Sequence, residues 1–239
     1  MILRAENLKK SYGSRTVVDG ISLTVNAGEI VGLLGPNGAG KTSTFYLVVG
    51  MIKSEGGKVE LGGSDISNIP MYIRAKKGIG FLPQEPSIFR RLSVEENLKI
   101  ILELLPLDLN IKKEKEEKLL EQLGLKDLRR QIAGTLSGGE KRRLEIARAL
   151  ISEPKFILLD EPFVGIDPIT VNDLQNILNQ LKADGLGILI TDHNVRDTLK
   201  IIDRAYIIYQ GKVLLEGNGQ ALLKSPEARK VYLGDQFQI

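Results

Sequence analysis

A glycine-rich run that ends in lysine and threonine is the stretch of this sequence best suited to chemistry. It follows the pattern G-x-x-x-x-G-K-T over residues 35–42, after the apolar segment 30–34 and before the segment 44–49, which we predict to begin a helix. Its glycines allow a tight turn that directs backbone N–H groups inward. Together with the helix N-terminus, these groups form a nest for phosphate. The strand, loop and helix therefore predict a phosphate-binding loop, in preference to an ordinary glycine turn with a solvated lysine.

Two side chains of this loop have distinct expected roles. Lys41 can reach the β- and γ-phosphates of a nucleotide, and the hydroxyl of Thr42 is suited to Mg²⁺. The residues that we expect to surround the nucleotide phosphates are Gly35, Pro36, Asn37, Gly38, Ala39, Gly40, Lys41, Thr42 and Ser43.

A second candidate is an apolar segment, 156–159, that is followed directly by two acids. Asp160 is expected to hold Mg²⁺, directly or through water. Glu161 leaves the chain on the other side and is placed to polarise a water in line with the γ-phosphate. Adjacent acids on their own would more simply end a strand at the surface. The phosphate-binding loop upstream favours the catalytic interpretation.

Two further polar residues follow predicted strands. His193, the one histidine of the sequence, comes after the segment 187–191 and could donate a hydrogen bond to the γ-phosphate, although a lone histidine is usually structural. Gln84 comes after the segment 79–82, between prolines, and its amide can contact Mg²⁺ or water. Because ligands bind at the carboxyl ends of parallel strands, we expect both residues beside the phosphate-binding loop.

Two candidates lie elsewhere in the sequence. Ser137, Gly138 and Gly139 begin a helix with a capping box to Glu140, which indicates either an ordinary cap or a second phosphate site. One fold seldom aims two phosphate nests at one phosphate, so two copies that face each other would explain both. Tyr12, beside a glycine, is a flat surface for a nucleotide base or a tyrosine that packs locally.

The elements that must position these residues alternate between strand-like and helix-like patterns, which predicts an α/β fold with a parallel core sheet. Antiparallel strands are expected at residues 2–8 and 21–25, with a further short strand at 16–18. A capping box at Ser93 and an amphipathic pattern over 112–123 predict a helical subdomain at about 86–150, within a single unit of residues 1–239.

Composition narrows the function classes. The net charge of +3, with lysine and glutamate interleaved over residues 112–123, argues against a nucleic-acid partner. The absence of cysteine excludes disulfides and thiolate metal sites. No apolar run has the length of a membrane span, and the N-terminus lacks the layout of a signal peptide. We expect a cytoplasmic protein that another subunit would have to hold at any membrane.

In this order, the motifs resemble those of the ATP-binding cassette (ABC) transporter ATPases over essentially the whole chain, and the segment 136–140 is the most diagnostic. The resemblance implies a P-loop NTPase of the ABC type with an antiparallel β subdomain and a helical subdomain. It also implies ATP, Mg²⁺ and a head-to-tail homodimer in which each phosphate-binding loop faces the partner's Ser137, Gly138 and Gly139.

The resemblance also implies individual roles. Tyr12 would stack on adenine, Glu161 would be the catalytic base and His193 the γ-phosphate switch. Gln84 would contact the nucleotide and its metal and couple the site to a membrane partner, and Asp167 would lie at the dimer seam.

A narrower resemblance is to the ATPase subunits of lipopolysaccharide-export systems, carried by the segments 80–93, 160–168, 191–196 and 231–235. It implies two inner-membrane permeases that dock near the Gln84 loop, where Phe89, Arg90 and Arg91 would receive them at the cytoplasmic face. The segment 106–118 matches poorly. Branched-chain amino-acid importers and soluble ABC ATPases that act on ribosomes or in DNA repair remain the alternatives.

Overall fold

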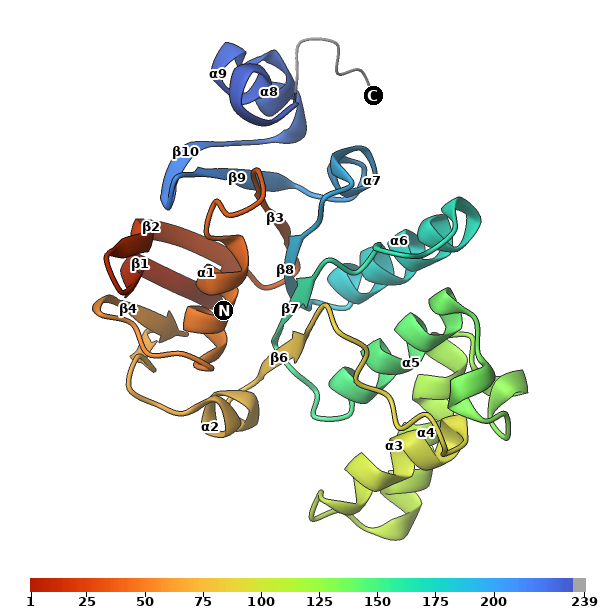
Figure 1. The fold of residues 1–239 in the computed structure, drawn as a ribbon. Coiled ribbons are helices and arrows are strands. Elements are labelled where there is room, and N and C mark those ends of the chain that lie inside the picture. The colour runs from red at the N-terminus through yellow and green to blue at the C-terminus, as the bar shows by residue number, and fades with distance from the viewer. Residues whose placement is uncertain (234–239) are drawn as a thin grey trace.

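Six strands form the main sheet of the computed structural model, which describes residues 1–233 (Figure 1). Their order is β10-β9-β3-β8-β7-β6, and β10 alone among the six lies antiparallel to its neighbour. Their bounds are β3 (Ile30–Leu34), β6 (Ile79–Leu82), β7 (Phe156–Asp160), β8 (Gly187–Thr191), β9 (Arg204–Tyr209) and β10 (Lys212–Gly217). Strands β3, β7 and β8 are buried throughout, as expected of central parallel strands. The α/β prediction is confirmed.

A second, antiparallel sheet has the order β2-β1-β4-β5, with β1 (Ile2–Tyr12), β2 (Arg15–Asn26), β4 (Gly56–Leu61) and β5 (Ser64–Asp65). Its first two strands are longer than predicted, and the expected short strand at 16–18 is the beginning of β2. The register between β1 and β2 shifts near Leu8 and Lys10. Such bulges break the alternation of apolar and polar residues that a strand prediction relies on.

Helix α1 (Lys41–Val49) lies between the two sheets (Figure 1). Phe45, Leu47, Val48 and Val49 are buried there in one apolar cluster with residues of both sheets. The helix begins earlier than the predicted residue 44 because Gly40, in a left-handed conformation, is its N-cap. The first turn, Lys41-Thr42-Ser43, has no apolar periodicity that could have revealed this.

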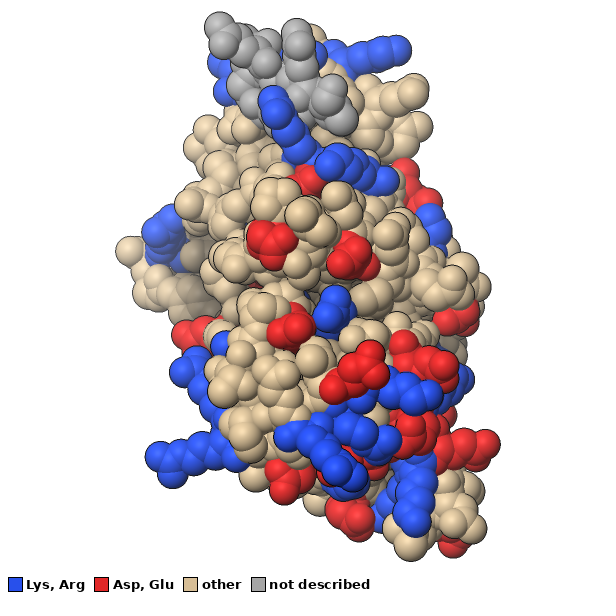
Figure 2. Space-filling model, turned by 90° about the vertical axis from the view of Figure 1, so that its right-hand side faces the viewer, with Lys and Arg blue, Asp and Glu red and all other residues tan. Residues whose placement is uncertain are grey.

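The helical part comprises α3 (Val94–Glu103), α4 (Leu109–Gln122) and α5 (Gly138–Leu150), grouped beside the β6 edge of the main sheet (Figure 1). Short α2 (Met71–Lys76) leads into β6. Both predicted capping boxes, at Ser93 and at Ser137, are formed. Helix α4 covers most of the poorly matching segment 106–118. Figure 2 views the molecule from the right-hand side of Figure 1. Over the lower part of this view, Lys and Arg side chains are interleaved with Asp and Glu side chains. The bounds 86–150 for a subdomain stay a prediction.

The C-terminal part adds α6 (Pro168–Ala183), α7 (Val195–Leu199), α8 (Gly219–Lys224), α9 (Pro226–Ala228) and a short π-helical turn, Arg229–Leu233. Leu222 and Ala228 of this part pack against Leu34 and Ile207 of the main sheet. Of the segment 231–235 that carried part of the narrower resemblance, Gly234 and Asp235 lie outside the described residues. Within residues 1–233, no helix is both long enough and apolar enough to cross a membrane.

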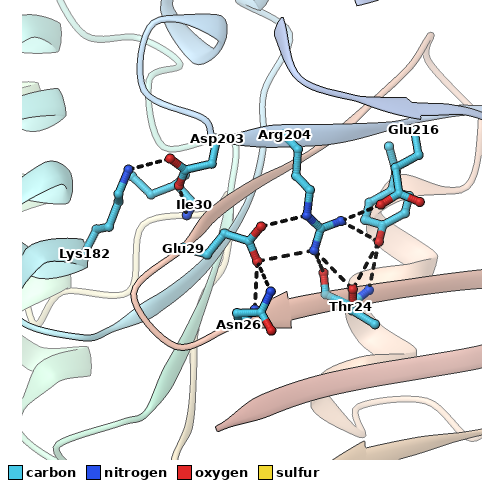
Figure 3. Close-up of polar contacts among 9 residues, drawn as sticks. Thr24, Asn26, Glu29, Ile30, Lys182, Asp203, Arg204 and Glu216 are labelled. Atoms are coloured by element: carbon cyan, nitrogen blue, oxygen red, sulfur yellow. Dashed lines mark hydrogen bonds and ion pairs between the residues drawn. The ribbon is translucent and has the colours of Figure 1, made fainter. Parts of the chain in front are cut away.

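Arg204 joins the two sheets through a polar cluster (Figure 3). Its guanidinium donates to Glu29 Oε1 at 2.7 Å and to the carbonyl of Thr24 on β2 at 2.7 Å. It also donates to Tyr206 and Glu216, on β9 and β10. One side chain thus fixes the end of β2 against β9 and β10, and so anchors the antiparallel sheet on the main sheet.

Candidate active site

Four strands of the main sheet end at the same place. The phosphate-binding loop follows β3, Gln84 follows β6, Glu161 follows β7 and His193 follows β8. Together with β2, these ends surround a cavity of about 380 Å³. Its lining consists of Arg15, Val17, Asn37, Gly38, Gly40, Lys41, Thr42, Ser43, Gln84, Glu161 and His193. The structure therefore brings together the loop, Gln84, Glu161 and His193, as the strand-end argument predicted.

The loop passes so close to its neighbours that two of its positions admit only glycine. A Cβ on Gly35 would lie 2.1 Å from the carbonyl oxygen of Ile208, and one on Gly40 would lie 2.4 Å from that of Val17. The Gly40 cap has no side chain to bond the first turn of α1. The N–H groups of that turn thus remain available to an anion.

Lys41 is held against the loop from which it projects. Its Nζ donates to the carbonyl oxygens of Gly35, at 2.7 Å, and Pro36, at 3.0 Å. Burial lowers the pKa of Lys41, and the nearby charges of Glu161 and Asp160 oppose that shift. The ammonium group thus lies at the cavity, near two carboxylates, where the phosphates of a nucleotide would compete for its three donors.

Glu161 is held from both sides by the two other strand-end residues. Gln84 Nε2 donates to its Oε2 at 2.7 Å, and His193 Nε2 lies 2.5 Å from its Oε1. The carboxylate is only 8% exposed, whereas the His193 side chain is 44% exposed. Glu161 has a left-handed backbone, with φ of 51°, and its N–H donates to the Thr191 carbonyl of β8. This fixed carboxylate, open to the cavity, is in a position to accept a proton from a bound water.

Asp160 lies beneath the cavity and does not line it. It is 1% exposed, and its Oδ1 has no hydrogen-bond partner. Burial, and then the charge of Glu161, raise the pKa of Asp160 to about 6 against the effects of Lys41, Arg142 and His193. A buried, unpartnered carboxylate oxygen on Asp160 suits a cation that prefers oxygen ligands, and the hydroxyl of Thr42 lines the cavity, so the chemistry of these residues fits Mg²⁺.

Among residues 1–233, no group of three or more His, Cys, Asp or Glu side chains is arranged to hold a metal. Mg²⁺ in nucleotide sites takes few protein ligands and is held largely by phosphate and water, so a small protein donor set is sufficient. The amide nitrogen of Gln84 faces Glu161. Its role as a metal ligand through the amide oxygen stays a prediction.

Five predicted nucleotide contacts outside the phosphate-binding loop do not line the cavity. Tyr12, at the end of β1, is 52% exposed, with Lys10 Nζ 5.5 Å from its ring centre. Ser137 caps α5 through Glu140, and Asp167 caps α6 by accepting from the N–H of Thr170 at 3.0 Å. Gly138 is exposed beside Ser137, and Gly139 packs against Thr170. The contacts of these five residues with ATP stay predictions.

The predicted partner-binding residues lie on the loop between β6 and α3. Phe89 is 43% exposed, and the Arg148 guanidinium of α5 lies 4.6 Å from its ring centre. Asn97 holds the Phe89 backbone by accepting from its N–H and donating to its carbonyl. Arg90 and Arg91 follow, both exposed. The loop thus presents one aromatic and two basic side chains on a braced backbone.

Two residues that the motif analysis missed belong to the site. Arg15 lines the cavity, and Arg142 of α5 donates to the carbonyl of Asp160. Arg15 comes three residues after Tyr12, and its place beside the loop depends on how the β1–β2 hairpin sits on the sheet. Arg142 could have been found from the sequence, because Glu145 follows it by three residues on a predicted helix. Two opposite charges at that spacing, among buried apolar positions, indicate a buried ion pair.

The sequence profile of the ABC transporter family matches residues 18–164. The chain belongs to the ABC transporter ATPase family. This ATPase is 54% identical to the lipopolysaccharide export system ATP-binding protein LptB of Haemophilus influenzae, over 100% of this chain and 99% of the relative. It is 51% identical to the protein of the same name from Escherichia coli K12, over 99% of each chain.

Among solved structures, a nucleotide-free ATP-binding cassette from an ABC transporter superimposes with a TM-score of 0.88 at 33% identity. The match covers 98% of this chain and 99% of that one. The ABC fold expected from the motifs is thereby confirmed. The ATPase accordingly binds nucleotide and couples ATP hydrolysis to transport.

Proposed function

We propose that this ATPase powers the extraction of lipopolysaccharide from the inner membrane and its export to the outer membrane. The assignment of lipopolysaccharide as the cargo rests on one observation. The chain is 51–54% identical, over nearly its full length, to relatives named as lipopolysaccharide export ATP-binding proteins. That similarity extends well beyond the matched family profile, which ends at residue 164. The chain would act as one nucleotide-binding unit, with residues 86–150 as its helical subdomain.

In the proposed reaction, the chain's own groups bind, orient and move protons around ATP. The loop N–H groups and Lys41 would hold the phosphates, and Thr42 and Asp160 would hold Mg²⁺, which would neutralise charge on the phosphates. Glu161 accepts the proton of the attacking water. His193 Nε2 contacts Oε1 of Glu161 and keeps that carboxylate oriented toward the water. His193 would also bind the γ-phosphate and so respond to its presence or loss.

The proposed site is completed by a second copy of the chain. Ser137, Gly138 and Gly139 present a helix N-terminus on α5 that does not line the chain's own cavity. In a head-to-tail homodimer, this N-terminus would face the partner's phosphate-binding loop, and Asp167 would lie at the seam. Tyr12 would supply the stacking surface for adenine. The exposure of Ser137, Gly138 and Tyr12 supports both assignments.

The proposed membrane partners are two inner-membrane permeases of the lipopolysaccharide-export type, which would hold the ATPase at the cytoplasmic face. Their coupling helices would contact Phe89, Arg90 and Arg91. That surface begins a few residues after Gln84, which donates to Glu161. A displacement of the loop would therefore reach the catalytic carboxylate through one side chain.

Recovery of the tagged ATPase from detergent-solubilised membranes, followed by mass spectrometry, tests the cargo. We expect two related permeases of the lipopolysaccharide-export type, and their loss when Phe89 and Arg91 are replaced by alanine. The matched control replaces exposed Leu109 and Lys113, which lie on α4. Recovery of amino-acid permeases, or of ribosomes without membrane proteins, would overturn the transport assignment and leave the ATPase chemistry intact.

A further inference from the structure

Arg15 is a cation of the nucleotide cavity that the motifs do not account for. It is the first residue of β2 and pairs across the hairpin with Tyr12. Its guanidinium approaches the phosphate-binding loop, since a Cβ placed on Gly38 would lie 3.6 Å from Nη2. Arg15 and Lys41 are the two Lys or Arg residues among those that line the cavity.

The two cations differ in what they already bind. Lys41 donates to two carbonyl groups of its own loop. The Arg15 side chain has no hydrogen bond or ion pair with any other residue in the range 1–233. An arginine carries five donors in a planar fork that matches phosphate oxygens. An exposed, unpaired guanidinium beside a phosphate nest therefore has its full donor set available to an anion.

The position of Arg15 along the cavity identifies the phosphate that it would meet. Arg15, Val17, Asn37 and Gly38 also border a second cavity of about 350 Å³, on the side of Tyr209 and Gln210. Gln84, Glu161 and His193 line the first cavity and not the second. The γ-phosphate would be cleaved at Glu161 and His193. Arg15 lies at the other end of the site, beside Tyr12.

We propose that Arg15 binds the phosphate nearest the base, the α-phosphate, of the nucleotide. The inference rests on the proposed arrangement of ATP in this cavity, with the γ-phosphate at Glu161. Arg15 would then contribute to the affinity for ATP and ADP alike and would leave the hydrolysis step unchanged. Because the guanidinium is exposed, its contribution is screened by salt.

The test measures ATP and ADP binding by calorimetry, together with steady-state ATPase rates, for the wild-type protein and for Arg15→Gln, Arg15→Lys and Arg130→Gln. Arg130 is exposed and distant in sequence from every cavity-lining residue, so it controls for the same loss of charge. In Arg15→Gln, we expect the affinity for ATP and for ADP to fall by a similar factor, about threefold to thirtyfold. KM should rise while kcat stays near its original value, and Arg15→Lys should recover part of the loss.

Three results would overturn the proposal. The first is unchanged affinity for both nucleotides in Arg15→Gln. The second is a loss matched by Arg130→Gln. The third is a loss for ATP with none for ADP, which would place Arg15 at the γ-phosphate. Melting temperatures within about 2 °C of wild type exclude misfolding as the cause. If the wild-type protein bound neither nucleotide, the proposed site itself would fail. Since no lipid or permease is present, the cargo proposal is not at stake.

Discussion

The guanidinium of Arg142 donates a 3.0 Å hydrogen bond to the backbone carbonyl of Asp160, and so ties helix α5 to the end of β7. The same group donates to the carbonyl of Pro83, just before Gln84, and to Oε2 of Glu145. Glu145 in turn accepts from the N–H of Ser87. One buried ion pair on α5 thus positions the loop around Gln84 and the strand end that carries Asp160 and Glu161.

Removal of this ion pair should separate stability from activity. We expect Arg142→Leu to lose about 3 kcal/mol or more of stability in urea unfolding, because Glu145 is left as a buried, uncompensated charge. The double variant Arg142→Leu/Glu145→Leu should recover much of that stability. Its ATPase rate should stay well below that of wild type, since no side chain would then hold Pro83 and Asp160. A stable double variant with normal turnover would show that the pair serves folding alone.

Glu161→Gln should bind ATP and lose most turnover. The substitution keeps the size of the side chain but removes the group that accepts the proton from water, which typically costs about 10²–10⁴ in rate. One of the two contacts to Gln84 and His193 would also meet an amide nitrogen in place of an oxygen. Single-turnover phosphate release measures the loss of hydrolysis, and an ATP-binding titration measures the retained affinity. Glu153→Gln, at an exposed position, is the control, and full activity in Glu161→Gln would refute the assignment of the base.

Gly139→Ala should destabilise the start of α5, because the new Cβ would lie 1.9 Å from Cγ2 of Thr170 on α6. We expect a loss of about 1–3 kcal/mol in chemical unfolding. Thr170→Ser removes that methyl group and keeps the hydroxyl that donates to Asp167. Gly139→Ala/Thr170→Ser should therefore regain part of the stability. Equal stability of the single and double variants would mean that the methyl contact is not the cause.

Asp160→Asn should make the nucleotide-free protein more stable at pH 8 while abolishing activity. The pKa of Asp160 is raised to about 6, so the folded state binds a proton that the unfolded state has released between pH 4 and 6. Wild-type stability from this group consequently falls as the pH rises through that window. The variant should gain about 1–3 kcal/mol at pH 8, and the gain should shrink towards pH 4. A destabilised variant at pH 8 would contradict this account.

Glu29 should give the opposite pH dependence. Burial alone would raise the pKa of Glu29, but hydrogen bonds from Arg204 and Asn26 outweigh burial and lower it (Figure 3). A lowered pKa means stability that is present above the ordinary value of 4.5 and is lost as the pH falls through the folded-state pKa. Glu29→Gln should cost about 1–3 kcal/mol at pH 7. Unfolding in urea at pH 7 and below pH 4 should show that difference disappear in acid, and a constant difference would exclude the linkage.

Local patterns determined much of this protein. Continuous apolar runs placed β3, β6 and β8 at their observed bounds. Central parallel strands are buried on both faces, so a strand of this kind can be recognised from its own residues alone. Both capping boxes were readable because their two members, such as Ser93 and Glu96, lie three residues apart. The phosphate-binding loop was readable for the same reason: its glycines, lysine and threonine act within one turn of chain.

Tertiary structure alone decided the contacts that make the loop into a site. Gln84 and Glu161 are 77 residues apart and meet because β6 and β7 pair in parallel and end together. Arg15 reaches the loop because the start of β2 is held at the β9–β10 turn, where the N–H of Asp19 donates to the carbonyl of Gly211 at 2.7 Å and the N–H of Gly211 donates to the carbonyl of Ala39. Charged side chains carry no periodicity that reveals their partner, and their position follows from strand order and sheet packing. Short sequence motifs therefore identified the residues that bind and hydrolyse nucleotide, whereas the contacts between those residues depended on the tertiary fold.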